Sequence, residues 1–238
     1  MRPTALFIVL IAYLLAASCG KDVELAGHLW TTTYIINGSD GERCKVDINL
    51  LCNSENSGVL FISETYDSDP MPYGSALPFS YTWDGDDGSV SIASGASCIN
   101  LPIEYEKAEH YSLNLDLSGL RDYYPYLAME FALGKKEYYA PVTVDGSHWE
   151  FGFGEPSESY LYVLDFSADS AALNLTYTAG DEEQHAGWGI SYTFANGVGD
   201  MRITNNAGYF GSFHGYFYLP DDGHLMFYDS ENVLPMSR

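Results

Sequence analysis

Phe79-Ser-Tyr-Thr-Trp-Asp-Gly-Asp-Asp-Gly-Ser-Val-Ser-Ile92 has a second copy, Ile190-Ser-Tyr-Thr-Phe-Ala-Asn-Gly-Val-Gly-Asp-Met-Arg-Ile203, 111 positions further along the chain. In both copies an apolar or aromatic residue takes every second position, namely Phe79, Tyr81 and Trp83 in the first and Ile190, Tyr192 and Phe194 in the second. This alternation is typical of a half-buried strand. A glycine-containing turn follows each strand and the alternation then resumes, which predicts a β-hairpin in each copy.

Two further matches, in the same order, indicate a duplication of the chain. Leu25-Ala-Gly-His-Leu-Trp30 corresponds to Val144-Asp-Gly-Ser-His-Trp149, and the inward positions Leu60 and Ile62 correspond to Leu173 and Leu175. The offset between the copies changes from 119 to 113 to 111 along the chain, and each change falls in a predicted loop. Conserved strand spacing with drifting loops is the pattern expected of a structural repeat.

Each half contains about seven short predicted strands in succession and no convincing amphipathic helix. Successive strands with tight turns form antiparallel meanders, and closing a meander into a barrel removes its exposed edges. The sequence therefore predicts an all-β protein of two tandem antiparallel meander barrels, one in 25–117 and one in 144–238.

The segment 118–143 is predicted to link the two units and to pack between them. It holds a short helical turn after Pro125, and a strand at 138–144 either completes the first barrel or begins the second. The segment is too apolar for a flexible linker, so a compact pair of units is expected.

The first residues predict export. Arg2, an apolar run over 5–15 and small residues before Cys19 indicate a signal peptide in 1–18, too short to cross a bilayer. Leu15-Ala-Ala-Ser-Cys19 resembles the lipobox of bacterial lipoproteins, which implies a lipidated Cys19, a tether in 19–24 and a membrane anchor. The alternative is an ordinary signal peptide with an incidental cysteine.

The residues after Cys19 indicate where the protein is anchored. Gly20-Lys-Asp-Val-Glu24 resembles the tag of surface-exported lipoproteins of Bacteroidetes. The resemblance implies an outer-membrane lipoprotein of the bacterial cell envelope, with surface exposure favoured over a periplasm-facing anchor.

The chain is strongly acidic. Loss of Arg2 with the signal peptide leaves 9 Lys and Arg against 33 Asp and Glu, a net charge of −24. Such a surface repels nucleic acid and anionic lipid headgroups, so nucleic acid is excluded as a partner.

Three cysteines remain besides Cys19. Cys44 and Cys52 flank one predicted strand, and at roughly 3.3 Å per residue they lie too far apart for a disulfide, which needs Cα atoms within about 7 Å. A bond from Cys98 to either one remains open. None of the three has a counterpart in the second half, so disulfides are not part of the repeated fold.

The Gly-x-x-Trp opening strand, the Tyr-Thr hairpin and Gly211-Ser-Phe-His-Gly215 resemble the lipocalin-like repeats common in Bacteroidetes lipoproteins. True lipocalins have Gly-x-Trp at this place, and each unit here is short for a roomy barrel. The resemblance implies an antiparallel barrel that encloses a small-ligand cavity.

No metal, cofactor or catalytic group is predicted. Asp84-Gly-Asp-Asp-Gly88 has the alternating carboxylates of a calcium loop, but the second copy lacks them, which favours a plain hairpin turn. The six histidines lack the paired spacing of a zinc site. Nucleophile and phosphate-loop motifs are missing, and Glu104 and Glu106 alternate as on a solvated strand face.

Clustered aromatic residues are the candidate binding groups. On the strand 209–219, Phe213 and Phe217 occupy one face, and the other carries His214, Tyr216 and Tyr218. The linker adds Tyr123, Tyr124 and Tyr126. Either these residues pack between the two units, the favoured explanation, or they bind a ligand such as a sugar, whose apolar ring face stacks on aromatic side chains.

The sequence therefore favours a membrane-anchored, non-catalytic lipoprotein that binds a small molecule or glycan, or that acts as an interaction module with a protein partner. Two alternatives remain. One is a carbohydrate-active enzyme with an unrecognised carboxylate pair in a cleft lined by tyrosines, and the other is a structural subunit of a surface complex.

Overall fold

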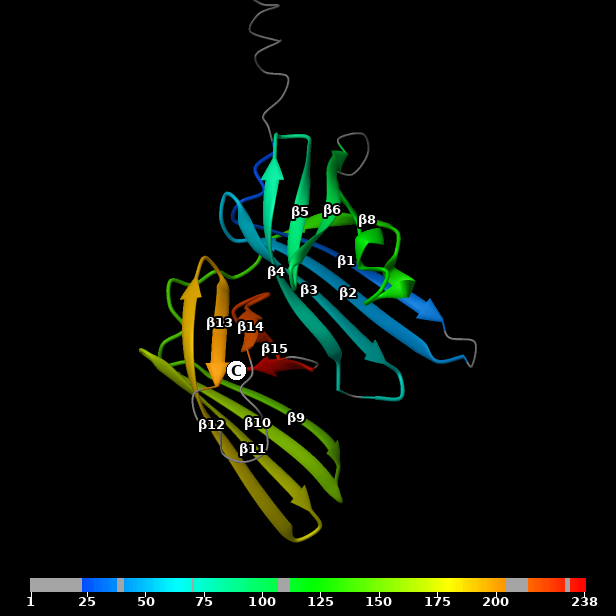
Figure 1. Cartoon of the computed structure of the whole chain (residues 1–238). Helices are drawn as coiled ribbons and strands as arrows, with labels where there is room; N and C mark the ends of the chain where they lie inside the picture. The colour runs from blue at the N-terminus through cyan, green and yellow to red at the C-terminus, as the bar shows by residue number, and fades with distance from the viewer. Residues whose placement is uncertain (1–22, 38–40, 70, 107–111, 204–213, 230–231) are drawn as a thin grey trace, which may run out of the picture.

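The computed structural model describes residues 23–37, 41–69, 71–106, 112–203, 214–229 and 232–238. Within these ranges the only helical elements are two short 3-10 helices, Ser118–Leu120 (η1) and Pro125–Leu127 (η2). The strands form two closed antiparallel barrels of eight strands each, in chain order (Figure 1). The predicted fold class is confirmed, with eight strands per barrel instead of about seven.

The strands of the first barrel are His28–Asn37 (β1), Arg43–Cys52 (β2), Ser57–Tyr66 (β3), Tyr73–Trp83 (β4), Asp87–Ser94 (β5), Ser97–Glu106 (β6), Ser112–Asp116 (β7) and Glu130–Lys136 (β8). Those of the second are His148–Glu155 (β9), Glu158–Ser167 (β10), Ser170–Ala179 (β11), Glu182–Ala195 (β12), Val198–Ile203 (β13), His214–Tyr218 (β14), His224–Tyr228 (β15) and Val233–Ser237 (β16).

The strand register confirms the internal repeat. Trp30 pairs with Leu50 in the first barrel, and Trp149 pairs with Leu164 in the second. In the two matching hairpins, Phe79 pairs with Ile92 and Ile190 pairs with Ile203. Each pair of residues matched by sequence therefore occupies the same place in its barrel.

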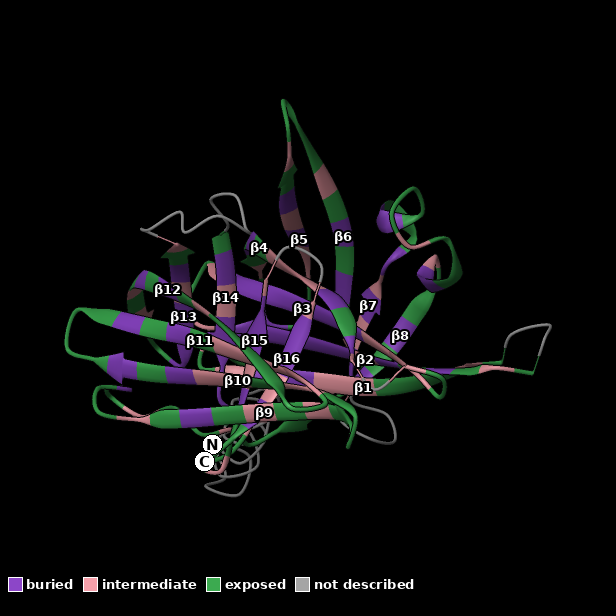
Figure 2. Cartoon of the chain, turned by 90° about the horizontal axis from the view of Figure 1, so that it is seen from below, coloured by how far each residue is buried: buried purple, intermediate pink, exposed green. Residues whose placement is uncertain are grey.

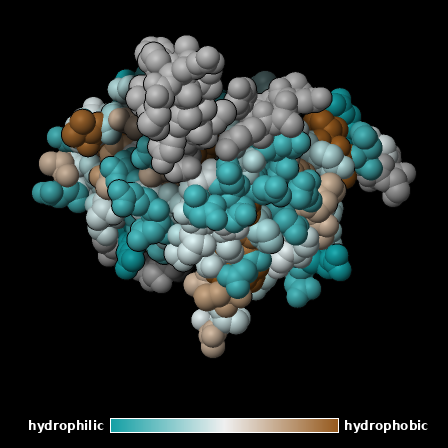
Figure 3. Space-filling model, turned by 90° about the horizontal axis from the view of Figure 1, so that it is seen from above, coloured by the Kyte–Doolittle hydropathy of each residue, from teal (hydrophilic) through white to brown (hydrophobic). Residues whose placement is uncertain are grey.

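Each barrel has its own hydrophobic core, built from the residues that point inward along the strands. Buried and exposed residues alternate at 164–167 of β10 and 170–174 of β11, and on β9 buried or half-buried residues alternate with exposed ones (Figure 2). Burial of this apolar surface is the main favourable contribution to folding. On the face of the molecule seen in Figure 3, hydrophilic residues predominate and hydrophobic areas are small.

A third buried cluster joins the two barrels. It takes Leu29, Leu51, Val59 and Phe61 from β1–β3, and Val198, Tyr218, Tyr228 and Val233 from the second barrel. Strands β2 and β3 are therefore buried on both faces, which explains their near-continuous apolar sequence. The backbone N–H of Val233 also donates to the Pro72 carbonyl at 2.9 Å, so the barrels share a backbone contact.

The segment 118–143 differs in part from its prediction. The helical turn after Pro125 is confirmed as η2. The strand that completes the first barrel, however, is Glu130–Lys136, and no strand lies at 138–144. Phe131 and Leu133 supply inward side chains for closure, whereas Tyr138 packs at the interface between the barrels and Val144 enters the second core. The first barrel therefore extends to Lys136.

The described cysteines are all free. Cys44 and Cys52 lie near opposite ends of the single strand β2, as predicted, and both are buried, whereas Cys98 is exposed on β6. No helix in the described ranges has the length and apolar character required to span a bilayer.

Candidate functional site

The wall of the first barrel opens where β4 and β5 diverge. β5 pairs with β4 only from Phe79 to Trp83, and the earlier part of β4 pairs with β3 alone. The last residues of β5, Ala93 and Ser94, pair with β6 alone. The divergence leaves a gap that backbone hydrogen bonds do not close.

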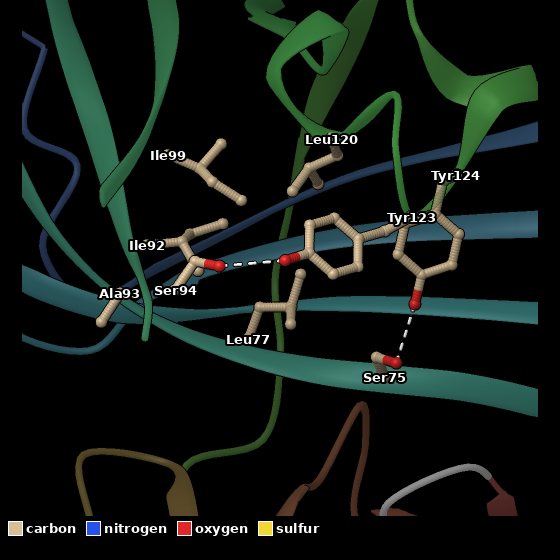
Figure 4. A pocket seen from close by; sticks show the side chains of 9 residues that line it. All are labelled: Ser75, Leu77, Ile92, Ala93, Ser94, Ile99, Leu120, Tyr123 and Tyr124. Carbon is tan, nitrogen blue, oxygen red and sulfur yellow. Dashed lines mark hydrogen bonds between the residues drawn. The ribbon is translucent and has the colours of Figure 1, made fainter. Parts of the chain in front are cut away.

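The turn that follows η1 places two tyrosines in this gap (Figure 4). The hydroxyls of Tyr123 and Ser94 are 2.9 Å apart, and the hydroxyl of Tyr124 donates to Ser75 Oγ at 2.7 Å. One tyrosine is thus tied to β5 and the other to β4. Leu120 and Leu127 are buried on either side of the pair and hold the segment against the barrel core.

A pocket of about 310 Å³ remains between this segment and the sheet. Its lining is mainly apolar and contains no charged side chain: Ser75, Leu77, Ile92, Ala93, Ser94, Ile99, Leu120, Tyr123 and Tyr124. Small-molecule sites are typically apolar clefts of roughly 300 to 1,000 Å³ with a few polar groups that orient the ligand. The pocket lies at the small end of that range.

The two tyrosines have different environments. Tyr123 is 61% exposed and forms the rim of the pocket, whereas Tyr124 is half-buried against the core. Burial raises the pKa of Tyr124 above its ordinary value, so its hydroxyl keeps its proton at neutral pH. The pocket therefore offers neutral hydroxyl groups and apolar surface.

Tyr126, the third predicted linker residue, lies outside the pocket. Its hydroxyl donates to Glu64 on β3, and the same carboxylate accepts a hydrogen bond from the Tyr66 hydroxyl at 2.8 Å. Tyr126 therefore fixes η2 to the barrel and does not face the cavity.

The other predicted binding residues lie on β14 in the second barrel. Tyr218 is buried between the barrels, where its ring centroid is 4.6 Å from that of Phe61, and Tyr216 borders the same cluster. Phe217 points into the second core, and Phe213 lies outside the described residues. Packing between the two units is thus confirmed for Tyr218, with Tyr216 at the border of the cluster. It is wrong for the linker tyrosines, which bond to serine and glutamate side chains of the first barrel. His214 is exposed, with its Nε2 2.8 Å from Asp200 Oδ1.

The structure supports the turn interpretation of 84–88. Asp84 Oδ1 accepts hydrogen bonds from the backbone N–H groups of Asp86 and Asp87 at 3.2 and 3.0 Å. In the part of the chain that the structure describes, no group of three or more His, Cys, Asp or Glu residues is arranged to hold a metal ion. Cys19 lies outside the described residues.

Sequence reasoning found Tyr123 and Tyr124 but missed the rest of the lining. Leu77, Ile92 and Ile99 follow the same alternation as core residues, so nothing local distinguishes them. Only the divergence of β4 from β5 makes them the wall of a pocket.

Comparison of the chain with protein families, curated proteins and solved structures finds no match.

Proposed function

We propose that this chain is a non-catalytic lipoprotein of the bacterial cell envelope that holds a small, mainly apolar ligand in the first-barrel pocket. Cys19 anchors it to the outer membrane, and the surface-export resemblance of 20–24 favours exposure at the cell surface. The observation that carries the proposal is the apolar pocket between β4 and β5, with Tyr123 at its rim.

The lining favours an apolar ligand over a glycan. A sugar carries many hydroxyl groups that need partners, but the polar side chains here are two serines and two tyrosines that already bond to one another. An apolar body with one hydroxyl or carbonyl group fits better, because that group can join a serine–tyrosine pair while the rest displaces water from apolar walls.

The pocket gives no support to the alternative of a carbohydrate-active enzyme. That alternative requires two close carboxyl groups in a cleft lined by tyrosines. The pocket lined by Tyr123 and Tyr124 has no carboxylate, and the acidic pocket lined by Asp87, Glu104, Asp116 and Glu130 has no tyrosine.

Native mass spectrometry of the full-length protein, purified from its own membrane, tests the proposal. We expect an extra mass that is lost under denaturing conditions. Leu77→Trp fills the pocket and should weaken the affinity for the ligand by at least about tenfold, a change worth about 1.4 kcal/mol of binding free energy, so the fraction of chains with the bound mass should fall. Tyr139→Ala, at an exposed tyrosine outside the pocket, should keep the bound mass. A bare wild-type chain, or a bound mass unchanged in Leu77→Trp, would refute the proposal.

The anchor has its own test. Cys19→Ser should move the protein from the membrane fraction to the soluble fraction and abolish incorporation of labelled fatty acid, because the acyl chains provide the membrane affinity. Retention of the variant in the membrane would contradict lipidation at Cys19.

A further inference from the structure

An open cleft of about 760 Å³ lies where the two barrels meet. The first barrel contributes the residues before β1 and the β2–β3 turn, the second contributes the β12–β13 turn, and the segment 138–142 between the barrels supplies the rest. In Figure 1 the β12–β13 turn points towards the first barrel. The lining residues all belong to the described ranges: Ala26, Gly27, Asn53, Ser54, Glu55, Tyr138, Ala140, Pro141, Val142, Ala195 and Asn196.

Tyr138 fixes the connecting segment to the second barrel. Its side chain packs against the buried cluster between the barrels, and its hydroxyl donates to the Asn196 carbonyl at 3.5 Å. A Cβ atom at Gly197 would come within 2.6 Å of the Tyr138 ring, so the ring lies directly on the turn. Asn196 and Gly197 have positive φ angles of 50° and 82°, as in the tight two-residue turns of hairpins. Packing and turn geometry thus hold Asn196 at the cleft.

The β2–β3 turn, 53–56, is held by hydrogen bonds of its own. The Ser54 hydroxyl accepts from the Ser57 backbone N–H at 3.1 Å and lies 2.6 Å from the Ser57 hydroxyl. The hydroxyl of Tyr81 donates to the Ser54 carbonyl at 2.8 Å. Ser54 is therefore used within the first barrel, and the turn that it stabilises carries Asn53 and Glu55 on either side of it.

Three lining side chains have hydrogen-bonding capacity that the described part of the chain does not use. They are the amides of Asn53 and Asn196 and the carboxylate of Glu55, none of which bonds to another group of the described residues. Asn53 is half-buried, and an amide in that position without a protein partner bonds to water or to a ligand. Amides both donate and accept, whereas a carboxylate only accepts.

The lining indicates a neutral ligand rich in hydroxyl groups. It contains no lysine, arginine or histidine that could pair with an anion, and Glu55 would repel one. A single exposed carboxylate holds a cation only weakly, because solvent screens exposed charges. Sugar hydroxyl groups both donate and accept, so they match two amides and a carboxylate, while Ala140 and Pro141 offer apolar contacts to the C–H groups of a sugar ring.

We infer that this junction cleft binds a neutral saccharide through Asn53, Glu55 and Asn196. Its volume falls within the range of roughly 300 to 1,000 Å³ that is typical of small-molecule sites, which often lie at domain interfaces. The cleft shares no residue with the apolar pocket of the first barrel, so the two sites are independent. Because both barrels contribute polar groups, a bound saccharide connects them across the junction.

A glycan array that carries neutral oligosaccharides and their sialylated or sulfated forms tests the inference with the full-length protein. We expect binding to at least one neutral glycan and weaker binding to its anionic forms, since the cleft has no cationic side chain. Leu77→Trp, which fills the first-barrel pocket, should leave this binding unchanged. Absence of binding to every neutral glycan, or binding that requires an anionic group, would overturn the inference.

Variants locate the site, with affinity for the best neutral glycan of the array measured by calorimetry. Asn53→Ala and Asn196→Gly should each weaken the affinity by at least about fivefold, because each removes hydrogen bonds to the sugar. Glycine suits the positive φ at position 196, so the turn is preserved. Asn174→Ala removes an exposed amide on β11, outside the cleft, and should not change the affinity. An unchanged affinity in either cleft variant would overturn the inference.

Discussion

His148 lies between two carboxylates at the surface of the second barrel. Its Nδ1 is 2.6 Å from Asp165 Oδ1 and its Nε2 is 3.0 Å from Glu150 Oε1. Hydrogen bonding to Asp165, and then to Glu150, raises the pKa of His148 above its ordinary value. The folded state therefore favours the charged imidazolium, and this stabilisation is complete below the unfolded pKa of about 6.5 and is lost as pH rises through the folded pKa.

His148→Gln should accordingly lower the free energy of unfolding at pH 6, and have little effect at pH 9. The loss at pH 6 should not exceed about 1 kcal/mol, because exposed ion pairs are screened by solvent. Urea unfolding at both pH values measures the difference. Asp165→Asn should remove most of the pH dependence, and an equal loss at both pH values would contradict this account.

Within the β12–β13 hairpin, Gly199 lies under aromatic rings. It pairs with Phe194 and Phe217 on the neighbouring strands, whose rings stack at 5.5 Å and 9°. A Cβ atom at position 199 would come within 1.7 Å of the Phe217 ring. Gly88 pairs with Trp83 at the same place in the first barrel, so the repeat keeps a glycine opposite an aromatic residue.

Gly199→Ala should reduce the free energy of unfolding by about 2 kcal/mol, since the buried Phe217 ring has to move. The matched control is Gly152→Ala on β9, where the nearest atom to the new Cβ is 3.6 Å away. That substitution should change stability by less than about 1 kcal/mol, in the stabilising direction. Similar destabilisation in both variants would show that loss of glycine alone, and not ring displacement, is responsible.

The same strands show how much of the structure could be predicted from the sequence. The alternation of apolar and polar residues predicted the hairpin at 79–92 and its copy, because the residues that alternate along each strand are the ones that pair across the hairpin. The closing strand β8 was missed, although Phe131 and Leu133 alternate with exposed residues, because this alternation spans only a few residues and the pairing with the distant β1 that closes the barrel is not visible locally. Tyr123 and Tyr124 could be suspected because they stand outside any strand, but the pocket beside them depends on strand divergence.

At the scale of the whole molecule, Phe61 is the centre of the contact between the barrels. It is fully buried, and its ring centroid lies 4.6 Å from that of Tyr218 and 4.9 Å from that of Tyr228. Aromatic pairs contribute about 0.5 to 1.5 kcal/mol beyond their buried area. The barrels are therefore expected to stabilise each other.

A double-mutant cycle tests this coupling. Phe61→Ala and Tyr218→Ala should show an interaction energy of about 1 kcal/mol in urea unfolding. Phe61→Ala combined with Phe166→Ala, in the second core, should be additive within about 0.5 kcal/mol. A Phe61–Tyr218 interaction energy near zero would mean that the barrels are joined but energetically independent.

The two barrels differ in how many residue pairs join their first and last strands. Three residue pairs join β1 to β8, but Glu150 and Ser237 form the single pair between β9 and β16. The guanidinium carbon of Arg238 lies 4.8 Å from the centroid of the Trp149 ring, and this cation–π contact adds a second link beside that pair. Local opening of the second barrel should therefore begin between β9 and β16, and the amide hydrogens of these two strands should exchange fastest. Once parted, β9 and β16 present two free edges, and at high protein concentration these are the edges through which neighbouring molecules would exchange strands and form swapped dimers.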